Sequence, residues 1–284
     1  MKMQDENITV ITGASGGIGK EFVKYCAGLG HRLILLDKNE DELLRLAIWL
    51  KKNFRVQVHP FAIDIASPAE LAAVTDFLRE QHFKIDWLIN NAGNGHVALF
   101  KESKLDAIQR ELNVNVLGTT LLTHELLPFM NNERKSYLLF MSSLACFYPL
   151  PLKNTYGAAK AFVTNFAGAL RFELAAENIS VSVCCPGPVN SNIPQHLADK
   201  LLSWKEQLLV EEPEVIVQAA IGGMLKEKKI IIPGFFNKVL FHVTNLMPQW
   251  LRAQWTKRQY SSKRKLLKEQ PLIPGEPNAE WPLR

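Results

Sequence analysis

The sequence has few cysteines, and their arrangement does not suggest a metal site. Four cysteines are spread over 284 residues, and none stands in a Cys-x-x-Cys or Cys/His spacing. This disfavours a zinc-stabilised module, and we predict no metal site. Cys184 and Cys185 are adjacent in an apolar run, where buried thiols are the expected state. We therefore expect reduced cysteines and a reducing, cytoplasmic environment.

Long hydrophobic runs and a strong excess of one charge are also missing. No uninterrupted apolar segment approaches the roughly 20 residues that span a bilayer, so we expect no transmembrane helix. No apolar stretch precedes the first predicted strand, so a signal peptide is not expected either. The net charge of +5 is modest for this length and does not by itself suggest nucleic acid as a partner.

The chain does have enough apolar sequence for a large core. Hydrophobic residues make up 47% and charged residues 21%, which is typical of a globular domain. Seven apolar runs alternate with helical patterns, and we predict strands at 8–12, 32–37, 56–64, 86–93, 137–143, 179–187 and 229–234. Apolar strands separated by helices indicate a parallel sheet buried on both faces. We predict an α/β, Rossmann-like doubly wound fold with a mostly seven-stranded parallel sheet.

The predicted domain covers residues 1–234, followed by a C-terminal helical appendage and tail at 235–284. Helices are expected at 19–30, 41–52, 67–81, 104–130 and 155–177. For the third of these, Ser67 is the expected N-cap, Pro68 the first helical residue and Glu70 the partner of Ser67 in a capping box.

A glycine-rich segment, TGASGGIG at residues 12–19, ends the first predicted strand and opens the first helix. Gly13, Gly17 and Gly19 allow a tight turn and let a pyrophosphate approach the helix N-terminus, where the helix dipole favours an anion. Ordinary turns also need glycine, but the position between strand and helix favours a nucleotide. Ser15 and Ile18 of the same segment are predicted cofactor contacts.

Acidic residues end the next two predicted strands. Asp37 stands 18 residues after Gly19, where a carboxylate can bind ribose hydroxyls and repel a 2′-phosphate. This favours NAD(H), and Lys38 keeps NADP(H) open because a lysine beside the carboxylate can reach a phosphate. Asp64 and Ile65 are predicted to lie beside the adenine, and a turn leading into a helix is the alternative for Asp64.

Tyr156 and Lys160 lie four residues apart in NTYGAAKAF, on one face of a predicted helix. Taken alone, the pair is typical of an amphipathic helix with a solvated lysine. A nearby ammonium, however, stabilises a phenolate and lowers its pKa from the ordinary value of about 10, which is too high for a base near neutral pH. Beside a cofactor, Tyr156 would therefore be a usable proton carrier.

Six motifs share the order and spacing of one enzyme family. They are Thr12-Gly13-(x3)-Gly17-Ile18-Gly19, Asn90-Asn91-Ala92-Gly93, Asn115, Ser143, Tyr156-(x3)-Lys160 and Pro186-Gly187. Over residues 7–234 the chain resembles the compact subgroup of the short-chain dehydrogenase/reductase family. The resemblance implies that Tyr156 is the general acid/base and that Lys160 binds the nicotinamide ribose. It also implies that Ser143, thirteen positions before the tyrosine, holds the substrate carbonyl oxygen, with Ser142 as the alternative.

The resemblance implies further roles. Asn115 would bind a water that links the lysine to solvent, and Asn91, Ala92 and Gly93 would shape the strand end beside the cofactor. Pro186, Gly187 and Val189 are the remaining expected cofactor contacts. Family members suggest a homo-oligomer, a dimer or a tetramer.

For the substrate, the sequence predicts only a chemical class. Residues 144–154 include Phe147, Tyr148, Leu150 and Leu152, and a predicted helical lid covers 192–209, so we expect an apolar substrate.

After Gly234, apolar residues and tryptophans at helical spacing are interrupted by Pro248. The basic residues that follow are Arg252, Lys257, Arg258, Lys263, Arg264, Lys265 and Lys268. The segment 235–268 suits a helix lying on an anionic membrane surface, and packing over the substrate cleft or against a second subunit is the alternative.

The sequence therefore predicts an NAD(P)(H)-dependent oxidoreductase that interconverts a secondary alcohol and a ketone on an apolar or lipid-like small molecule. A dinucleotide-binding regulator without turnover is one alternative, which the complete serine, tyrosine and lysine set disfavours. A sugar-nucleotide epimerase or dehydratase is another, which the TGxxxGxG spacing and the short C-terminal region disfavour. We expect a cytoplasmic protein, or one peripheral to a membrane surface.

Overall fold

The computed structural model describes residues 7–261 except 191–206, 249, 255 and 259. Its centre is a single parallel sheet in the order β3-β2-β1-β4-β5-β6-β7. The strands are β1 (Ile8–Thr12), β2 (Arg32–Asp37), β3 (Val58–Ala62), β4 (Trp87–Asn90), β5 (Ser136–Met141), β6 (Ile179–Cys184) and β7 (Ile230–Ile231). The strand order reverses between β1 and β4, which opens a crevice at the carboxyl ends of these strands. The predicted seven-stranded, doubly wound sheet is confirmed.

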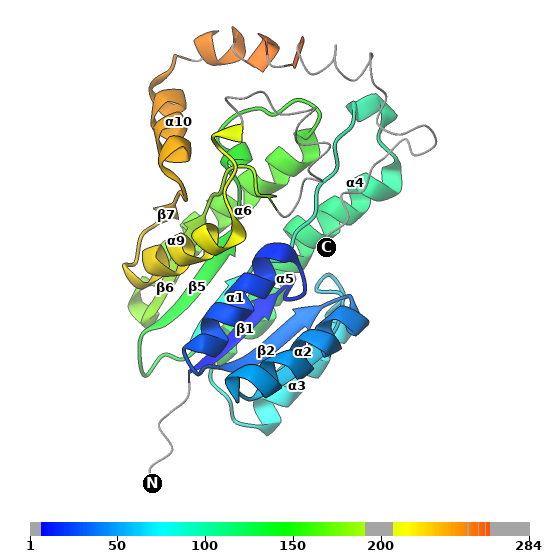
Figure 1. Cartoon of the computed structure of the whole chain (residues 1–284), viewed down its shortest axis with the longest axis vertical. Helices are drawn as coiled ribbons and strands as arrows, with labels where there is room; N and C mark the ends of the chain where they lie inside the picture. Colours follow the sequence, from blue (N-terminus) through cyan, green and yellow to red (C-terminus); the bar gives the residue numbers. More distant parts are fainter. Residues whose placement is uncertain (1–6, 191–206, 249, 255, 259, 262–284) are drawn as a thin grey trace.

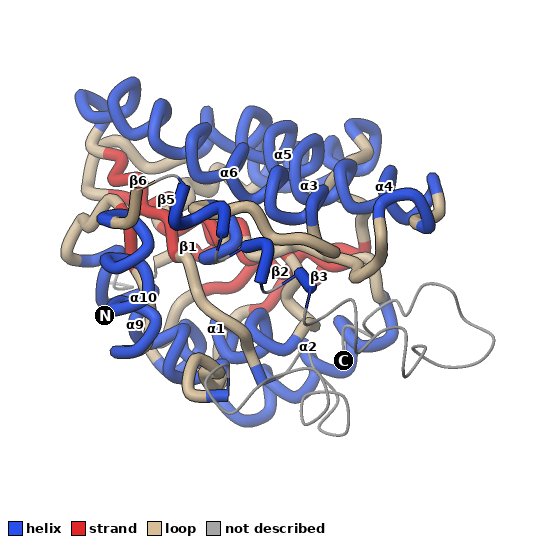
Figure 2. Tube along the Cα trace, turned by 90° about the horizontal axis from the view of Figure 1, so that it is seen from above, coloured by secondary structure: helices blue, strands red, loops and turns tan. Residues whose placement is uncertain are grey.

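Helices cover both faces of the sheet and make three layers (Figure 1 and Figure 2). One face carries α1 (Gly17–Gly28), α2 (Glu40–Phe54) and α9 (Pro213–Leu225). The other carries α3 (Pro68–Glu80), α5 (Thr119–Leu126) and α6 (Asn154–Glu173). Val10 and Leu88 point into the core under α3, α5 and α6, whereas Ile11 and Ile89 point into the core under α1 and α9. Successive strand residues thus fill two separate cores.

Several strands are shorter than predicted because their last residues turn into the crevice. β3 ends at Ala62, β4 at Asn90 and β6 at Cys184, so Asp64, Asn91 and Pro186 all lie in the segments beyond. Cys184 and Cys185 are fully buried, as predicted.

The helix predicted over 104–130 is not continuous. It divides into α4 (Leu105–Leu112), a π-helical turn η2 (Asn113–Gly118), α5 and a final 3₁₀ turn η3 (Leu127–Phe129). The π turn is found where the backbone packs closely, because a Cβ on Gly118 would lie 2.7 Å from Cγ1 of Ile65. π turns inside helices occur often at functional sites, and this one carries Asn115. Three further 3₁₀ turns are η1 (Phe100–Glu102), η4 (Leu144–Cys146) and η5 (Leu174–Glu177).

The capping box predicted at α3 is wrong in both halves, because the Ser67 side chain makes no capping hydrogen bond and the Glu70 carboxylate bonds elsewhere. Ser67 is the N-cap and Pro68 begins the helix, but the Glu70 carboxylate accepts from the Asp64 N–H at 2.7 Å. The Ser67 N–H already donates to the Asp64 carbonyl oxygen at 2.9 Å, so Glu70 takes the other free donor of that turn. Glu70 therefore holds the turn that carries Asp64 and Ile65.

The C-terminal region forms α10 (Phe235–Leu246) beyond β7, at the periphery of the molecule in Figure 1. Its end before Pro248 confirms the predicted interruption, because the extended Met247 is the conformation that precedes proline (φ −73°, ψ 127°). Helical backbone resumes at residue 250. The described helices include none with the length and apolar character needed to cross a membrane.

The predicted lid at 192–209 falls mostly outside the described residues, as do the basic residues from 263 onward and the C-terminal tail.

Candidate active site

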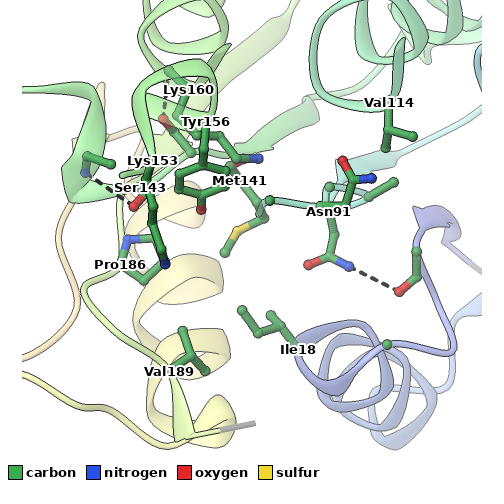
Figure 3. Close-up of a pocket in the computed structure, with 18 of the residues that line it drawn as sticks. Ile18, Asn91, Val114, Met141, Ser143, Lys153, Tyr156, Lys160, Pro186 and Val189 are labelled. Atoms are coloured by element: carbon green, nitrogen blue, oxygen red, sulfur yellow. Dashed lines mark hydrogen bonds between the residues drawn. The ribbon is translucent and has the colours of Figure 1, made fainter. Parts of the chain in front are cut away.

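A cavity of about 760 Å³ lies at the carboxyl edge of the sheet (Figure 3). Every residue predicted to bind the cofactor lines it: Gly13, Ser15, Gly17, Ile18, Gly19, Asp37, Asp64, Ile65, Asn91, Ala92, Gly93, Tyr156, Lys160, Pro186, Gly187 and Val189. Ser143 lines the same cavity. Segments far apart in the chain therefore meet in one space large enough for a nucleotide and a small substrate.

The glycine-rich turn between β1 and α1 is shaped by close backbone contacts. Gly13 has a positive φ of 62°, and a Cβ on Gly19 would lie 1.9 Å from the Gly13 carbonyl oxygen. Helix α1 starts at Gly17, two residues earlier than predicted, and its N-cap Gly16 offers no side-chain cap. The first N–H groups of α1 are therefore available to an anion, and no side chain fills the turn. These features fit a pyrophosphate.

Asp37 ends β2, as predicted, and its carboxylate lies at the rim of the glycine turn. One oxygen accepts from the Ser15 N–H at 2.9 Å and the other from the Asn39 N–H at 3.0 Å. These bonds fix the carboxylate beside the turn. The Asp64 side chain is exposed, and it accepts from the Ala66 N–H at 2.9 Å.

Asn91 joins the ends of β1 and β4. Its side-chain amide donates to the carbonyl oxygens of Thr12 at 3.0 Å and of Gly13 at 3.1 Å. The Thr12 hydroxyl accepts in return from the N–H groups of Asn91 at 3.0 Å and Ala92 at 2.9 Å. The NNAG segment therefore holds the glycine turn in place, in addition to lining the cavity.

Tyr156, Ser143 and Lys160 come together where β5 meets the first turns of α6 (Figure 3). The buried Lys160 ammonium donates to the Met141 carbonyl oxygen at 3.0 Å and lies 5.8 Å from the centre of the Tyr156 ring. The neighbouring Ser142 is buried and donates to the Lys160 carbonyl oxygen at 2.9 Å. Ser142 is thus engaged with the backbone of α6, and Ser143 is the serine placed at Tyr156.

The surroundings of this group change its protonation. Burial raises the pKa of Tyr156 to about 12, and a hydrogen bond with the Ser143 hydroxyl acts in the opposite direction. Burial also lowers the pKa of Lys160 to about 8. The net shift in the tyrosine pKa is therefore upward, opposite to the lowering expected from Lys160 alone, because loss of hydration disfavours the phenolate.

Asn115 does not line the cavity. It is fully buried in the π turn η2, and its amide donates to the carbonyl oxygens of Asn94 at 2.7 Å and Glu111 at 2.9 Å. Its Oδ1 has no hydrogen-bond partner among the described residues. A Cβ on Gly93 would lie 2.8 Å from this oxygen and 2.9 Å from Nζ of Lys160, so both atoms face the space beside Gly93. The predicted water at Asn115 stays a prediction.

The sequence did not reveal two features around Tyr156. A Cβ on Gly95 would lie 2.7 Å from Cδ2 of Tyr156, so the tyrosine ring packs directly on this backbone. The second glycine of NNAGNG was the available signal. Glu111 and His96 form a buried pair nearby, with Nδ1 of His96 2.6 Å from a Glu111 carboxylate oxygen. A glutamate within an amphipathic helix gave no such signal.

The apolar end of the cavity differs in part from the prediction. Tyr148, Leu150 and Leu152 line it, but Phe147 does not. Phe147 instead packs against Phe241 of α10, with ring centres 4.7 Å apart. Further wall residues come from separate segments: Val97, Leu209, Leu240, Thr256 and Tyr260. Among the described residues, no group of His, Cys, Asp or Glu side chains is arranged to hold a metal ion.

The sheet order, the glycine turn and the shared cavity define a Rossmann-like dinucleotide-binding protein with a Ser-Tyr-Lys group in its crevice. The family model described as short chain dehydrogenase matches residues 7–201, and the chain belongs to this family.

Known proteins similar to the chain include curated relatives and solved structures. Mouse dehydrogenase/reductase SDR family member 7B is 30% identical over 189 residues, which are 66% of this chain and 58% of that protein. Human inactive hydroxysteroid dehydrogenase-like protein 1 is 27% identical over 248 residues, 85% of this chain and 72% of that protein. The chain thus spans less than two thirds of the mouse protein.

Among solved structures, a short-chain dehydrogenase from Sphingobium yanoikuyae in complex with NADPH superposes with a TM-score of 0.71 at 27% identity. The superposition covers 95% of this chain and 98% of that one.

Proposed function

We propose that the protein is an NAD(P)(H)-dependent oxidoreductase that interconverts a secondary alcohol and a ketone on an apolar small molecule. One observation carries this proposal: the Ser143, Tyr156 and Lys160 side chains meet in the same cavity as the glycine turn after β1. The chemistry needs these groups next to each other, because the proton and the hydride leave or reach neighbouring atoms of one substrate.

The residues have distinct roles in this scheme. Bound nicotinamide would supply the hydride donor or acceptor. Tyr156 would give a proton to the substrate oxygen in reduction and take it in oxidation, and Ser143 would hold that oxygen by a hydrogen bond. With a pKa of about 8, the buried Lys160 is still largely protonated at neutral pH, so it holds a positive charge near the phenol.

NAD(H) is the favoured cofactor. The Asp37 carboxylate lines the cavity at the end of β2, and two backbone hydrogen bonds fix it there. A fixed negative charge accepts hydrogen bonds from a ribose diol and repels a 2′-phosphate. The alternative is NADP(H), because the similar Sphingobium enzyme was solved with NADPH and Lys38 also lines the cavity.

An apolar substrate is supported by the apolar side chains that line part of the cavity. Leu150, Leu152, Leu209 and Leu240 contribute aliphatic side chains, and Tyr148 contributes an aromatic one. Such a wall binds mainly through burial of apolar area, at about 25 cal/mol for each Å². A lipid-like alcohol or ketone fits this wall better than a sugar does.

A dinucleotide-binding protein without turnover is a second candidate. It is favoured by one observation, the word inactive in the names of several relatives of 27–28% identity. The complete Ser143, Tyr156 and Lys160 set supports the enzyme instead, since a pure binding protein has no need of the phenol.

The test is a panel of alcohols and ketones of graded chain length, followed by the absorbance of the reduced cofactor. The Tyr156→Phe variant should lose activity by roughly 10²–10⁴-fold, the usual contribution of a general acid or base. Its affinity for NADH, measured by fluorescence titration, should stay unchanged. Retained turnover in this variant would remove Tyr156 from the mechanism, and cofactor binding without turnover on any substrate would favour the second candidate.

Helix α10 supports a contact with an anionic membrane surface. Its polar Asn237 and Thr244 are buried, whereas Phe235, Val243 and Leu246 are exposed to 72%, 50% and 86%. An outward apolar stripe on a helix that carries the exposed Lys238, followed along the chain by basic residues such as Lys257, suits the interface of a negatively charged bilayer.

Self-association is supported by exposed apolar side chains on two elements that pack together, the π turn η2 and α6. Leu117 of the π turn and Phe162 and Phe172 of α6 are exposed to 45%, 41% and 76%. Exposed apolar side chains on neighbouring helices are typical of subunit contacts. We expect a dimer or tetramer by light scattering, and Phe172→Asp should shift it toward monomer.

A further inference from the structure

A buried carboxylate beside the catalytic group is not explained by the proposed reaction. Glu111 lies near the C-terminal end of α4, and its side chain is 1% exposed. His96, in the segment after β4, is 8% exposed and places Nδ1 2.6 Å from a carboxylate oxygen of Glu111. The other ring nitrogen of His96 lies 3.1 Å from the Ser103 hydroxyl. The second Glu111 oxygen has no hydrogen-bond partner among the described residues.

Glu111 contacts the supports of Tyr156 and Lys160 directly. The Thr155 hydroxyl, one residue before Tyr156, donates to the Glu111 carboxylate at 2.8 Å. The Glu111 carbonyl oxygen accepts from the amide of Asn115, which faces Lys160 across Gly93. On the other side, Gly95 precedes His96 and packs on the Tyr156 ring. One carboxylate therefore links α4, the segment after β4 and the first turn of α6.

The charge of Glu111 acts on both reactive groups. Burial has the larger effect on both pKa values, and the Glu111 carboxylate raises the pKa of Tyr156 further. The pKa of Lys160, which burial lowers, is raised in part by Cys185, then by Glu111 and Cys146. Burial raises the pKa of Glu111 itself, while the Thr155 hydroxyl, His96 and Lys153 lower it. Burying a carboxylate costs free energy, and the contacts with Thr155 and His96 offset part of that cost. The charged or titratable groups that face it are His96 from the segment after β4, Lys153 at the N-cap of α6, and Tyr156 and Lys160 from α6. Cys146 of η4 and Cys185 after β6 act on the same tyrosine and lysine.

We propose that Glu111, held by His96 and Thr155, is a positioning residue that balances the positive charge of Lys160 and fixes the first turn of α6 around Tyr156. The kinetic consequence rests on the proposed function, whereas the electrostatic link to Lys160 does not. The two parts can therefore be tested separately.

The electrostatic part is tested on the protein without turnover. In protein labelled with ¹³C at the lysine side-chain ε-carbon, the Lys160 signal should titrate near pH 8, apart from surface lysines, and Lys160→Met assigns it. Glu111→Gln keeps the acceptor for Thr155 but removes the charge, so it should lower the Lys160 midpoint by about one pH unit. Glu125→Gln is the matched control, because Glu125 also contacts a histidine, His124 at 3.2 Å, but on the exposed surface. Equal midpoints in the parent and both variants would overturn the charge link.

The positioning part is tested at Thr155. Thr155→Val removes the hydroxyl and keeps the shape, so it should lower kcat by about tenfold and raise amide hydrogen exchange at the start of α6. Thr155→Ser should restore both the turnover and the protection from exchange. Identical kcat and exchange in the two variants would overturn the positioning role.

The kinetics give a further test, the direction in which the pH profile of kcat moves. The pH profile of kcat in Glu111→Gln should move to lower pH, because the pKa values of Tyr156 and Lys160 both fall when the carboxylate is removed. An unmoved profile would contradict the proposal. A protein with no turnover but a shifted Lys160 titration would reject the proposed function and keep the charge link. If Glu111→Gln does not fold, the Thr155 pair still decides the positioning role by hydrogen exchange.

Discussion

The two walls of the cavity are built by different means. The wall formed by the glycine turn and the NNAG segment consists largely of backbone, and its contacts are close: a Cβ on Gly19 would lie 1.9 Å from a carbonyl oxygen. The other wall consists of aliphatic and aromatic side chains such as Leu150, Leu209 and Leu240, from segments that share no motif. The first wall requires residues without a side chain at its close contacts. The second wall requires side chains that add apolar surface.

This difference decides how each wall tolerates change. A backbone contact below 3 Å leaves no freedom, so a single methyl group moves the turn. An apolar wall needs the right volume and hydrophobicity, and several residues satisfy that requirement about equally well. Substitutions on the first wall should therefore act as all-or-none changes, and those on the second as graded ones.

The largest expected effect is at Gly19. Gly19→Ala places a methyl group against the Gly13 carbonyl oxygen, so the turn must move and the affinity for NADH should fall on the order of 10²-fold. Gly16→Ala is the matched control, because its Cβ would meet its nearest atom, the same oxygen, at 3.4 Å. Fluorescence titration measures the NADH affinity of both variants. Equal affinities in the two variants would contradict the close-contact account of this wall.

Gly95 should give the next largest effect, on turnover instead of binding. Gly95→Ala would place Cβ 2.7 Å from the Tyr156 ring, and the ring or the segment must shift. We expect kcat to fall by about tenfold, since small misplacements of a reacting group are costly, while NADH affinity changes little.

Gly222→Ala in α9 is the control for Gly95→Ala. A Cβ there meets nothing within 4 Å, and alanine favours a helix. Steady-state rates on one ketone compare the two variants. A loss of NADH affinity equal to the loss of kcat would mean that Gly95 belongs to the binding wall.

The sequence predicted the first wall residue by residue. Gly13, Gly19 and Asn91 occupy positions where backbone geometry leaves few alternatives, so the residue type itself carries the information. The apolar wall was predicted only as a class. Phe147 was assigned to it wrongly, because an apolar side chain packs as favourably against the Phe241 ring as against an apolar ligand.

The same contrast between local and long-range causes applies to the fold. The seven strands were predicted from apolar runs, but the π turn at Asn113–Gly118 was not, because the residue that packs on its Gly118, Ile65, lies far away in the sequence. The Glu111–His96 contact was missed for the same reason: two polar residues 15 positions apart gain meaning only when the chain folds.

A smaller effect, on cofactor preference, is expected at Asp37 on the polar rim of the first wall. Asp37→Asn removes the negative charge but keeps an oxygen that can accept from Ser15. The preference for NADH over NADPH should fall by about tenfold, because one charge interaction near a protein surface is worth about 1 kcal/mol or more. Asp41→Asn, on the exposed first turn of α2, is the control. Titrating both cofactors against both variants measures the ratio, and an unchanged ratio would remove Asp37 from cofactor selection.

The smallest effect is expected on the exposed surface of helix α10. Leu246 is 86% exposed, and Leu246→Glu replaces an apolar group of the outward stripe by a negative charge. Binding to vesicles containing phosphatidylserine should weaken by about threefold, since a single side chain contributes part of the buried area of an interfacial helix. Leu105→Glu is the matched control, because Leu105 is 78% exposed on α4, away from the stripe. Flotation at two salt concentrations measures both variants. A membrane role requires that Leu246→Glu alone weakens binding and that added salt weakens it further, whereas equal flotation of the parent and both variants would assign the exposed face of α10 to a protein contact instead.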